Sequence, residues 1–217
     1  MEQGKVILFI GDSITDGNRY KDPGMEWDLN HQMGHSYAYI VNGIMGCKYP
    51  EKKYVFKNRG ISGNRIADVF ARKEADLFAL KPDVLSILVG INNGPLAQNN
   101  EIATSEEEFD VIYRLLLKGV KERLPECQIV LMEPFVCKAG WVKDCYEQWR
   151  SAVSGYGEVV KQLAQDFDAV FIPLQKKFDI LSEQFGAAYW SWDGIHPTEN
   201  GHGLIAMEWM KAMEGRL

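Results

Sequence analysis

Two short and almost entirely apolar runs, each ending at a glycine, constrain the fold of this chain most strongly. Val6–Ile10 ends at Gly11, and Val84–Val89 ends at Gly90. A strand has this composition when both of its faces pack against other elements instead of water, as in a parallel sheet. The two runs therefore predict interior strands of a parallel sheet.

Further strand and helix patterns alternate with these runs. Short apolar stretches at 54–56, 129–132 and 169–172 predict three more strands. Apolar residues recurring at three or four positions predict helices over 35–46, 65–79, about 105–124, 145–167, about 174–185 and 199–213. Such an alternation builds a parallel sheet with helices on both faces. We predict an α/β fold with five parallel strands, in a single domain over residues 1–217, because no linker-like stretch divides the chain.

Composition and charge indicate which classes of binding partner are not expected for this protein. Charged residues make up 25% of the chain and hydrophobic residues 46%, as in ordinary globular proteins. A net charge of −6 without a Lys/Arg cluster lacks the electrostatic footprint of a nucleic-acid binder. No apolar stretch approaches the ~18 residues of a membrane span, and no signal-peptide pattern opens the chain. We expect a cytoplasmic protein without nucleic-acid or membrane partners, although a secreted protein lacking its signal would have the same sequence.

Cysteine and histidine spacing gives no metal-site pattern. The four cysteines are Cys47, Cys127, Cys137 and Cys145. They form no C-x-x-C motif, and we expect free thiols in a reducing compartment. Asp28, His31 and His35 have a spacing that could hold zinc, but no H-E-x-x-H surrounds them, and we interpret them as a solvated loop. His202 is expected in core packing or at the surface. No nucleotide-binding motif occurs, so we expect neither metal nor cofactor.

Polar residues follow the first and third predicted strands, where ligands of open parallel sheets bind. Asp12 and Ser13 come directly after Gly11, and this places a small hydroxyl at the edge of the sheet. Asn92 and Asn93 follow the third strand, and a side-chain amide there can donate into a cleft. Each segment also suits an ordinary turn or a helix cap, so neither alone identifies a site.

Two further segments have the same ambiguity when taken singly. The stretch 58–64 follows the second strand and contains Gly63, beside which a backbone N–H can approach a ligand closely. Asp193 and His196 lie three apart in a turn, so the carboxylate can reach Nδ1 and leave Nε2 free as a base. A structural Asp–His pair would look the same. Together the four segments supply the nucleophile, base, orienting acid and oxyanion donors that acyl transfer by serine needs.

Four short blocks carry a resemblance to a known family. They are Gly11-Asp12-Ser13-Ile14, Gly63, Gly90-Ile91-Asn92 and Asp193-Gly194-Ile195-His196-Pro197. In this order they resemble the blocks of the SGNH hydrolases, also called GDSL esterases. The resemblance implies a three-layer, flavodoxin-like fold and a carboxylic ester hydrolase without cofactor.

The same resemblance implies a role for individual residues. Ser13 would be the nucleophile, His196 the base and Asp193 the residue that orients the base. The backbone N–H groups of Ser13 and Gly63, with the Asn92 amide, would form the oxyanion hole. In the family the third block commonly reads Gly-x-Asn-Asp, and Asn93 stands here in place of the Asp, which puts a supporting contact in doubt.

A narrower resemblance suggests the substrate. Residues 11–17 with the insertion after them, 58–64, Met132–Phe135 and Trp192–Pro197 resemble the SGNH branch that deacetylates xylo-oligosaccharides. Members of that branch are intracellular and oligomeric, so a homo-oligomer acting on an acetylated sugar is implied. A lysophospholipase or an acyl thioesterase would have the same catalytic blocks. A non-catalytic carbohydrate-binding domain is the other alternative, although such a domain would be expected to lose Ser13 or His196.

Five residues near the motifs are candidates for contact with the substrate: Asp12, Trp27, Asn93, Trp190 and Trp192. Trp192 abuts Asp193, and we expect its indole to wall the acyl pocket. Trp27 lies in the polar and aromatic insertion after Ser13, where a sugar could stack on it. For Trp190, core packing is an equally good interpretation.

Overall fold

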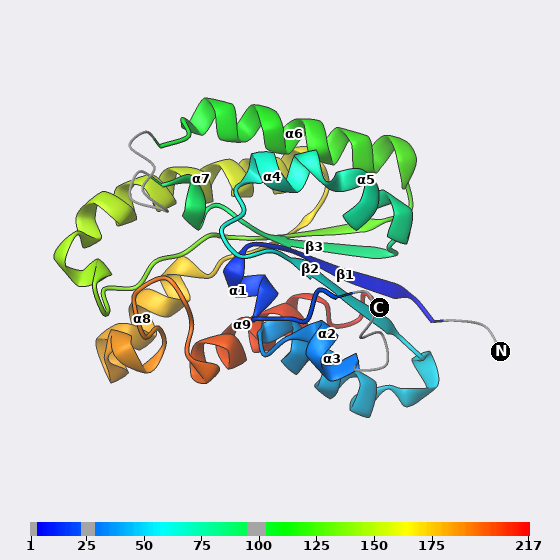
Figure 1. The fold of residues 1–217 in the computed structure, drawn as a ribbon, viewed down its shortest axis with the longest axis horizontal. Coiled ribbons are helices and arrows are strands. Elements are labelled where there is room, and N and C mark those ends of the chain that lie inside the picture. The colour runs from blue at the N-terminus through cyan, green and yellow to red at the C-terminus, as the bar shows by residue number, and fades with distance from the viewer. Residues whose placement is uncertain (1–3, 23–28, 95–102) are drawn as a thin grey trace.

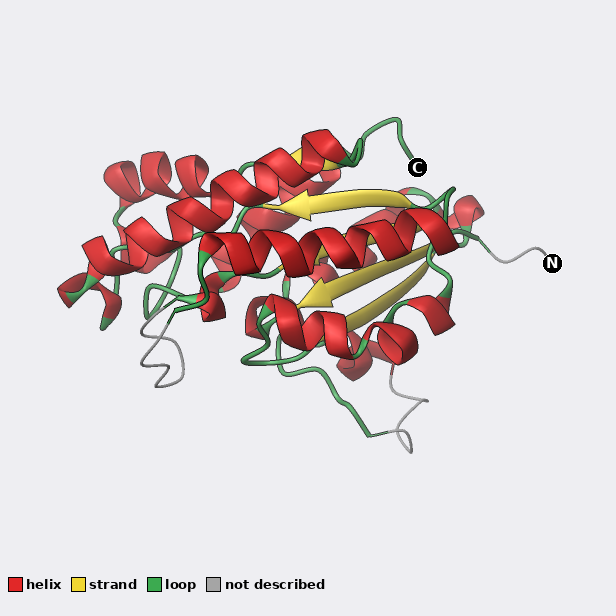
Figure 2. Ribbon diagram, turned by 90° about the horizontal axis from the view of Figure 1, so that it is seen from above, coloured by secondary structure: helices red, strands yellow, loops and turns green. Residues whose placement is uncertain are grey.

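Five parallel strands form one sheet in this computed structural model, which describes residues 4–22, 29–94 and 103–217. The strands are β1 (Val6–Gly11), β2 (Val55–Gly60), β3 (Val84–Leu88), β4 (Gln128–Met132) and β5 (Val170–Ile172). Their order is β2-β1-β3-β4-β5, which is the flavodoxin-like order. The strand arrows visible in Figure 2 share one direction. The predicted α/β fold is thereby confirmed.

Helices cover both faces of the sheet (Figure 1). One face carries α4 (Ile66–Ala71), α5 (Lys73–Asp76), α6 (Glu106–Arg123) and α7 (Tyr146–Asp166). The other carries α1 (Ser13–Asp16), α2 (Leu29–Met33), α3 (Tyr37–Lys48), α8 (Gln175–Phe185) and α9 (Glu199–Ala212). Within the described ranges, no helix has both the length and the apolar character needed to span a bilayer.

The alternation of side chains along β1 divides the core in two. Ile7 and Phe9 belong to the apolar cluster under α3 and α9, whereas Leu8 and Ile10 belong to the cluster under α4, α6 and α7. All four side chains are fully buried. Because burying one such side chain stabilises the fold by about 1.5–3 kcal/mol, both layers of helices are held firmly against the central strand.

Two predicted boundaries are wrong. The helix expected over 65–79 is divided into α4, α5 and a 3₁₀ turn at Phe78–Leu80. Apolar periodicity reports which face is buried and not whether the helix is continuous, and the backbone leaves helical geometry at Leu77, with φ at −128°. The strand expected over 54–56 continues to Gly60. Polar Asn58 concealed this extension, because its buried side chain satisfies backbone groups of neighbouring segments.

Candidate active site

Ser13 is the first residue of α1 and follows the carboxyl end of β1. Asp12 caps this short helix, and its carboxylate accepts the N–H of Ile14 at 3.0 Å. A Cβ at Gly11 would collide with the carbonyl oxygen of Leu88 on β3, so only glycine allows the two strands to approach here. The hydroxyl of Ser13 is thus presented at the carboxyl edge of the sheet, between β1 and β3. This is the usual ligand-binding position of this strand order.

A continuous hydrogen-bonded chain joins three residues that were predicted to act together. The Ser13 Oγ lies 2.9 Å from Nε2 of His196, and Nδ1 of His196 lies 2.7 Å from Oδ2 of Asp193. The other carboxylate oxygen of Asp193 accepts the N–H groups of Ile195 and His196, at 2.9 and 2.7 Å. An ionised carboxylate only accepts, so Nδ1 must donate and Nε2 is left to accept the proton of the serine hydroxyl.

The loop that carries Asp193 and His196 is fixed by further hydrogen bonds. The buried hydroxyl of Ser191 donates to the carbonyl of His196 at 2.9 Å and accepts the N–H of Gly194 at 3.0 Å. The carbonyl of Gly194 in turn accepts the N–H of Cys137 at 2.8 Å. These bonds tie the loop to the chain that follows β4, so the imidazole is held in place by backbone and not by packing alone.

The environment shifts the pKa values of all three titratable groups around Ser13. The hydrogen bond to Asp193 raises the pKa of His196, although burial opposes this shift. Burial works to raise the pKa of Asp193, but the hydrogen bonds from His196 and Ile195 outweigh it and lower that pKa. Burial raises the pKa of Asp12 to about 7, and the nearby His196 works against this rise. The pKa values of Asp12 and His196 are therefore both raised beside Ser13, and that of Asp193 is lowered.

Two backbone N–H groups near Ser13 and in the turn after β2 have no hydrogen-bond acceptor among the described residues. In the turn after β2, the N–H groups of Ile61, Ser62 and Asn64 all donate within the protein. No hydrogen bond among the described residues uses the N–H of Gly63, which has φ at +82°. The N–H of Ser13, in the first turn of α1, has no acceptor in its own helix. Both groups remain available as donors.

The two asparagines after β3 have different environments. Asn92, 8% exposed, donates through Nδ2 to the carbonyl of Asn64 at 3.2 Å. That acceptor fixes the orientation of the amide and leaves its second N–H for another partner. Asn93 is buried, and its side chain donates to Thr104 and accepts from the N–H of Ile66. Asn93 therefore holds loops together, and at 1% exposure its side chain is less accessible to a substrate than that of Asn92.

The candidate substrate-binding tryptophans also differ. Trp192 is 62% exposed, and its indole is stacked on the imidazole of His196. Trp190 is half-buried against the core, and its Nε1 donates to the carbonyl of Leu181 at 3.2 Å. Its ring contacts are with Phe185 and Tyr189. Trp27 lies outside the described residues. Asp12 adjoins Ser13, but it is 1% exposed and serves as a helix cap.

Histidines and cysteines outside the site show no metal-ligating arrangement in the described ranges. No group of three His, Cys, Asp or Glu side chains there could hold a metal ion, and Asp28 lies outside these ranges. His202 is buried, accepts the N–H of Tyr37 at 3.2 Å, and has its pKa lowered by burial to about 4. This is the core-packing position expected for it. All four cysteines are free thiols.

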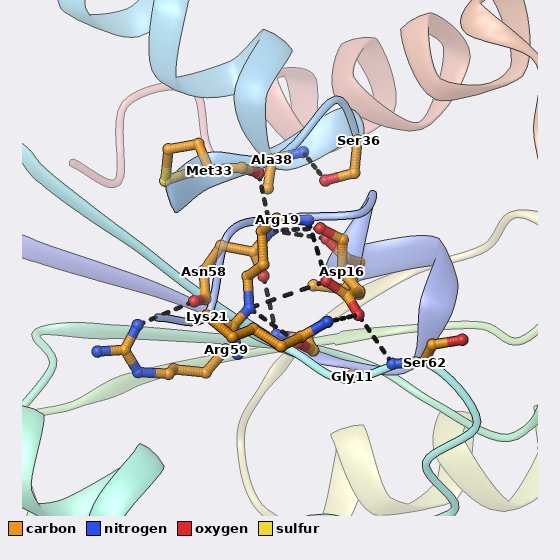
Figure 3. A network of polar contacts seen from close by, with 12 residues as sticks. Gly11, Asp16, Arg19, Lys21, Met33, Ser36, Ala38, Asn58, Arg59 and Ser62 are labelled. Atoms are coloured by element: carbon orange, nitrogen blue, oxygen red, sulfur yellow. Dashed lines mark hydrogen bonds and ion pairs between the residues drawn. The ribbon is translucent and has the colours of Figure 1, made fainter. Parts of the chain in front are cut away.

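Two residues that sequence reasoning missed connect the parts of the site. Asp16, at the end of α1, accepts the N–H of Ser62 through a buried carboxylate (Figure 3). Arg72 donates to the side chain of Asn64 at 2.7 Å and to the carbonyl of Gly11 at 3.3 Å. Nothing in the sequence marks the bonds from Ser62 to Asp16 and from Arg72 to Gly11, because they join residues 46 and 61 positions apart.

Comparison with known proteins agrees with this geometry. Residues 9–204 match the model of the GDSL-like lipase/acylhydrolase family. The chain belongs to this family. It is also 32% identical over 214 residues to an acetylxylan esterase from Geobacillus stearothermophilus, a match that covers 96% of this chain and 93% of the relative. As a member of the GDSL family with an esterase as relative, the chain is a carboxylic ester hydrolase, and its substrate is an ester.

Solved structures of GDSL enzymes share the whole architecture. A protein from Parabacteroides merdae described as a GDSL-like lipase superposes with a TM-score of 0.90 at 34% identity, covering 99% of this chain and 97% of that one. The crystal structure of the Geobacillus stearothermophilus acetylxylan esterase superposes with a TM-score of 0.83 at 32% identity, covering 97% and 94%. The likeness therefore extends over the sheet and both helical layers.

Proposed function

We propose that this ester hydrolase uses Ser13 as its nucleophile and removes acetyl groups from a carbohydrate, such as an acetylated xylo-oligosaccharide. The observation that carries the proposal is the chain of short hydrogen bonds from Ser13 through His196 to Asp193. The related Geobacillus esterase adds support, since its variants described as catalytic mutants replace one serine and one aspartate.

In the first half of the proposed reaction, Ser13 Oγ attacks the carbonyl carbon of the ester while Nε2 of His196 takes the hydroxyl proton. The negative charge then develops on the carbonyl oxygen. The N–H groups of Ser13 and Gly63 and the Nδ2 of Asn92 donate to that oxygen. When the tetrahedral intermediate collapses, His196 returns the proton to the leaving sugar alkoxide, and the acetyl group stays on Ser13.

The second half repeats these steps with water as nucleophile. His196 takes a proton from the water, which attacks the acetyl-serine carbonyl, and the same three donors hold the oxyanion. Collapse releases acetate, and the proton on His196 restores the Ser13 hydroxyl. Asp193 keeps Nδ1 protonated throughout and stabilises the imidazolium that forms twice in each cycle.

The surroundings of Ser13 favour a carbohydrate ester over a lipid ester. An exposed, flat indole beside the base, as in Trp192, suits stacking on a sugar ring. The hollow of about 500 Å³ between α3, α9 and the C-terminal residues, lined by both apolar and charged side chains, borders Tyr54, which precedes β2. It therefore lies at the amino edge of the sheet, away from Ser13 at the carboxyl edge. A lysophospholipase or thioesterase needs its apolar groove beside the nucleophile.

The thiols support a reducing compartment as the place of action. All four cysteines are free thiols, including the exposed Cys47, and free thiols are typical of proteins in reducing compartments. We propose the cytoplasm on this basis.

Labelling with a fluorophosphonate tests the nucleophile. The wild-type protein should be labelled once, at Ser13, and Ser13→Ala should lose both the label and p-nitrophenyl acetate hydrolysis while keeping its melting temperature. Ser62→Ala, which changes an exposed serine and keeps its backbone N–H, is the matched control and should label as wild type does. A Ser13→Ala protein that keeps more than about a percent of kcat would refute the assignment.

Direct comparison of natural esters tests the substrate. Acetylated xylo-oligosaccharides should be hydrolysed with a higher kcat/KM than lysophospholipids or acyl thioesters of long chains. The opposite ranking would replace the carbohydrate by a lipid or thioester substrate and leave the role of Ser13 unchanged.

A further inference from the structure

We propose that Asp16 is a positioning residue, which sets the oxyanion donor of Gly63 relative to the nucleophile. The proposal rests on the proposed function of Ser13 and Gly63, and it assigns a role to a residue that does not touch the reacting atoms. Asp16 ends the helix that Ser13 begins, and its carboxylate reaches the turn that carries Gly63.

The carboxylate of Asp16 bridges the two halves of the site. Its Oδ2 accepts the N–H of Ser62 at 3.0 Å, and Ser62 directly precedes Gly63. The same oxygen contacts Nζ of Lys21 at 2.6 Å, while Oδ1 accepts the N–H of Arg19 at 3.2 Å. Figure 3 shows these contacts converging on one carboxylate. At 1% exposure, Asp16 is screened from water, so its hydrogen bonds are not exchanged for solvent.

The bond to Ser62 is one of three that define the turn. The N–H of Ile61 donates to the carbonyl of Gly11 at 3.1 Å, and the N–H of Asn64 closes the turn on the carbonyl of Ile61 at 3.1 Å. Only the bond from Ser62 reaches a side chain. With the flanking N–H groups held, the peptide plane that carries the N–H of Gly63 has little freedom to rotate.

The backbone of Asp16 is fixed as well, which makes its carboxylate a rigid reference. The amide of Asn58 donates to the carbonyl of Thr15 at 2.7 Å and to that of Asp16 at 3.4 Å. A Cβ at Gly60 would collide with the backbone of Asp16, so β2 ends in direct contact with α1. Few flexible torsions therefore separate α1 from the turn that carries Gly63, so the distance between them varies little.

A neutral side chain of the same shape cannot reproduce these contacts. In Asp16, both oxygens accept from N–H groups: one from Ser62 and the other from Arg19. An asparagine has one oxygen and one NH₂ group, so one of these donors would face another donor. Asp16→Asn should therefore loosen the turn while preserving volume and burial, which separates positioning from packing.

The test measures kcat and KM for p-nitrophenyl acetate in Asp16→Asn, expressed per Ser13 labelled by a fluorophosphonate so that misfolded molecules do not count. We expect kcat to fall about 10- to 100-fold, as for a misplacement of around 1 Å, with KM changed less than about twofold. Asp166→Asn is the matched control. Like Asp16, Asp166 pairs with a basic side chain, that of Arg114 at 2.7 Å, but it ends α7 and lies outside the site. Its kcat should equal that of wild type.

A double-mutant cycle with Asn92→Ala supplies a readout that a merely structural role would not move. The Asn92 amide donates to the carbonyl of Asn64 in the same turn, so the two changes should be non-additive in kcat. A cycle of Asp166→Asn with Asn92→Ala should be additive.

The outcomes decide between this proposal and the one on which it rests. If Ser13 is labelled and Asp16→Asn keeps kcat within twofold, the positioning role is refuted and the nucleophile stands. If Ser13 is not labelled in wild type, the proposed function itself fails. Asp16→Ala is the second variant, and its kcat must also fall by more than twofold if Asp16 positions the Gly63 donor. An effect confined to KM, an additive cycle, or loss of folding in both variants would also refute the role.

Discussion

The indole of Trp192 lies nearly parallel to the imidazole of His196, with ring centroids 5.4 Å apart and an interplanar angle of 14°. An aromatic face beside a cation is worth about 0.5–1 kcal/mol at an exposed site. In the proposed mechanism His196 becomes cationic when it takes the Ser13 proton, so the indole stabilises that charged intermediate on one of its faces. The other face, on a residue that is 62% exposed, is open to a substrate.

The preference for short acyl groups should depend on Trp192. Wild-type kcat/KM should decrease from p-nitrophenyl acetate through butyrate to octanoate, since the indole stands beside the base where a longer chain must extend. Trp192→Ala should raise the octanoate-to-acetate ratio, because each newly buried methylene adds about 0.8 kcal/mol of binding. A wild-type preference for octanoate would contradict the carbohydrate proposal, and an unchanged ratio in Trp192→Ala would remove the indole from the acyl pocket.

The pH dependence of kcat/KM should follow the ionisation of His196, which must be neutral to act as base. Because Asp193 raises the pKa of His196, the rate should rise through a midpoint above the ordinary histidine value of 6.5. The negative charge of Asp12 contributes to that rise. Asp12→Asn should therefore move the midpoint to lower pH while retaining the oxygen that caps Ile14. A midpoint that stays in place, or a flat profile, would contradict the electrostatic coupling.

Asp12 should also make stability depend on pH. Burial raises its folded-state pKa from 3.8 to about 7, so the folded protein holds a proton that the unfolded chain releases. The stability that this provides is complete below about pH 3.8 and is lost as the pH rises through about 7. Asp12→Asn should consequently raise the melting temperature more at pH 8 than at pH 5. Equal increments at the two pH values would mean that Asp12 is ionised in the folded state at both.

Asp193→Asn should lower kcat by about 10⁴-fold, since loss of the correct tautomer costs this much in a serine protease triad. An asparagine in place of the carboxylate can present its NH₂ group to Nδ1, which then accepts, and Nε2 carries the proton instead. KM should change little. A kcat near that of wild type would show that another group orients His196.

Asn92→Ala should mainly lower activity, whereas Asn93→Ala should mainly lower stability. Asn92→Ala should lower kcat by about 10²–10³-fold with a small change in KM, because an oxyanion donor acts mainly in the transition state. Asn93→Ala should lower the melting temperature more than kcat, because its buried amide is bonded to Thr104 and Ile66. If Asn93→Ala lowered kcat more than Asn92→Ala did, Asn93 would be the donor.

The sequence alone predicted the fold class, and it indicated the segments that carry the candidate site. Interior strands of a parallel sheet are apolar on both faces, so runs such as Val6–Ile10 can be recognised from their composition. Residues after such strands share one edge of the sheet, and this predicted that Ser13 and Asn92 would lie in the same region. Asp193 and His196 are close in sequence, so their contact required no tertiary information.

Only the tertiary structure decided which polar residues support the site and which could meet a substrate. Asp16 resembles any acid at a helix end, and its bond to Ser62 arises because β2 packs directly against α1. Asn92 and Asn93 are adjacent and chemically identical, yet one amide reaches the turn at Asn64 and the other is enclosed. Patterns of apolar residues indicate which side chains are buried, and such a pattern is visible in each segment of the sequence by itself. Hydrogen bonds between buried polar groups depend on distances between segments, and those distances exist only after the core has formed.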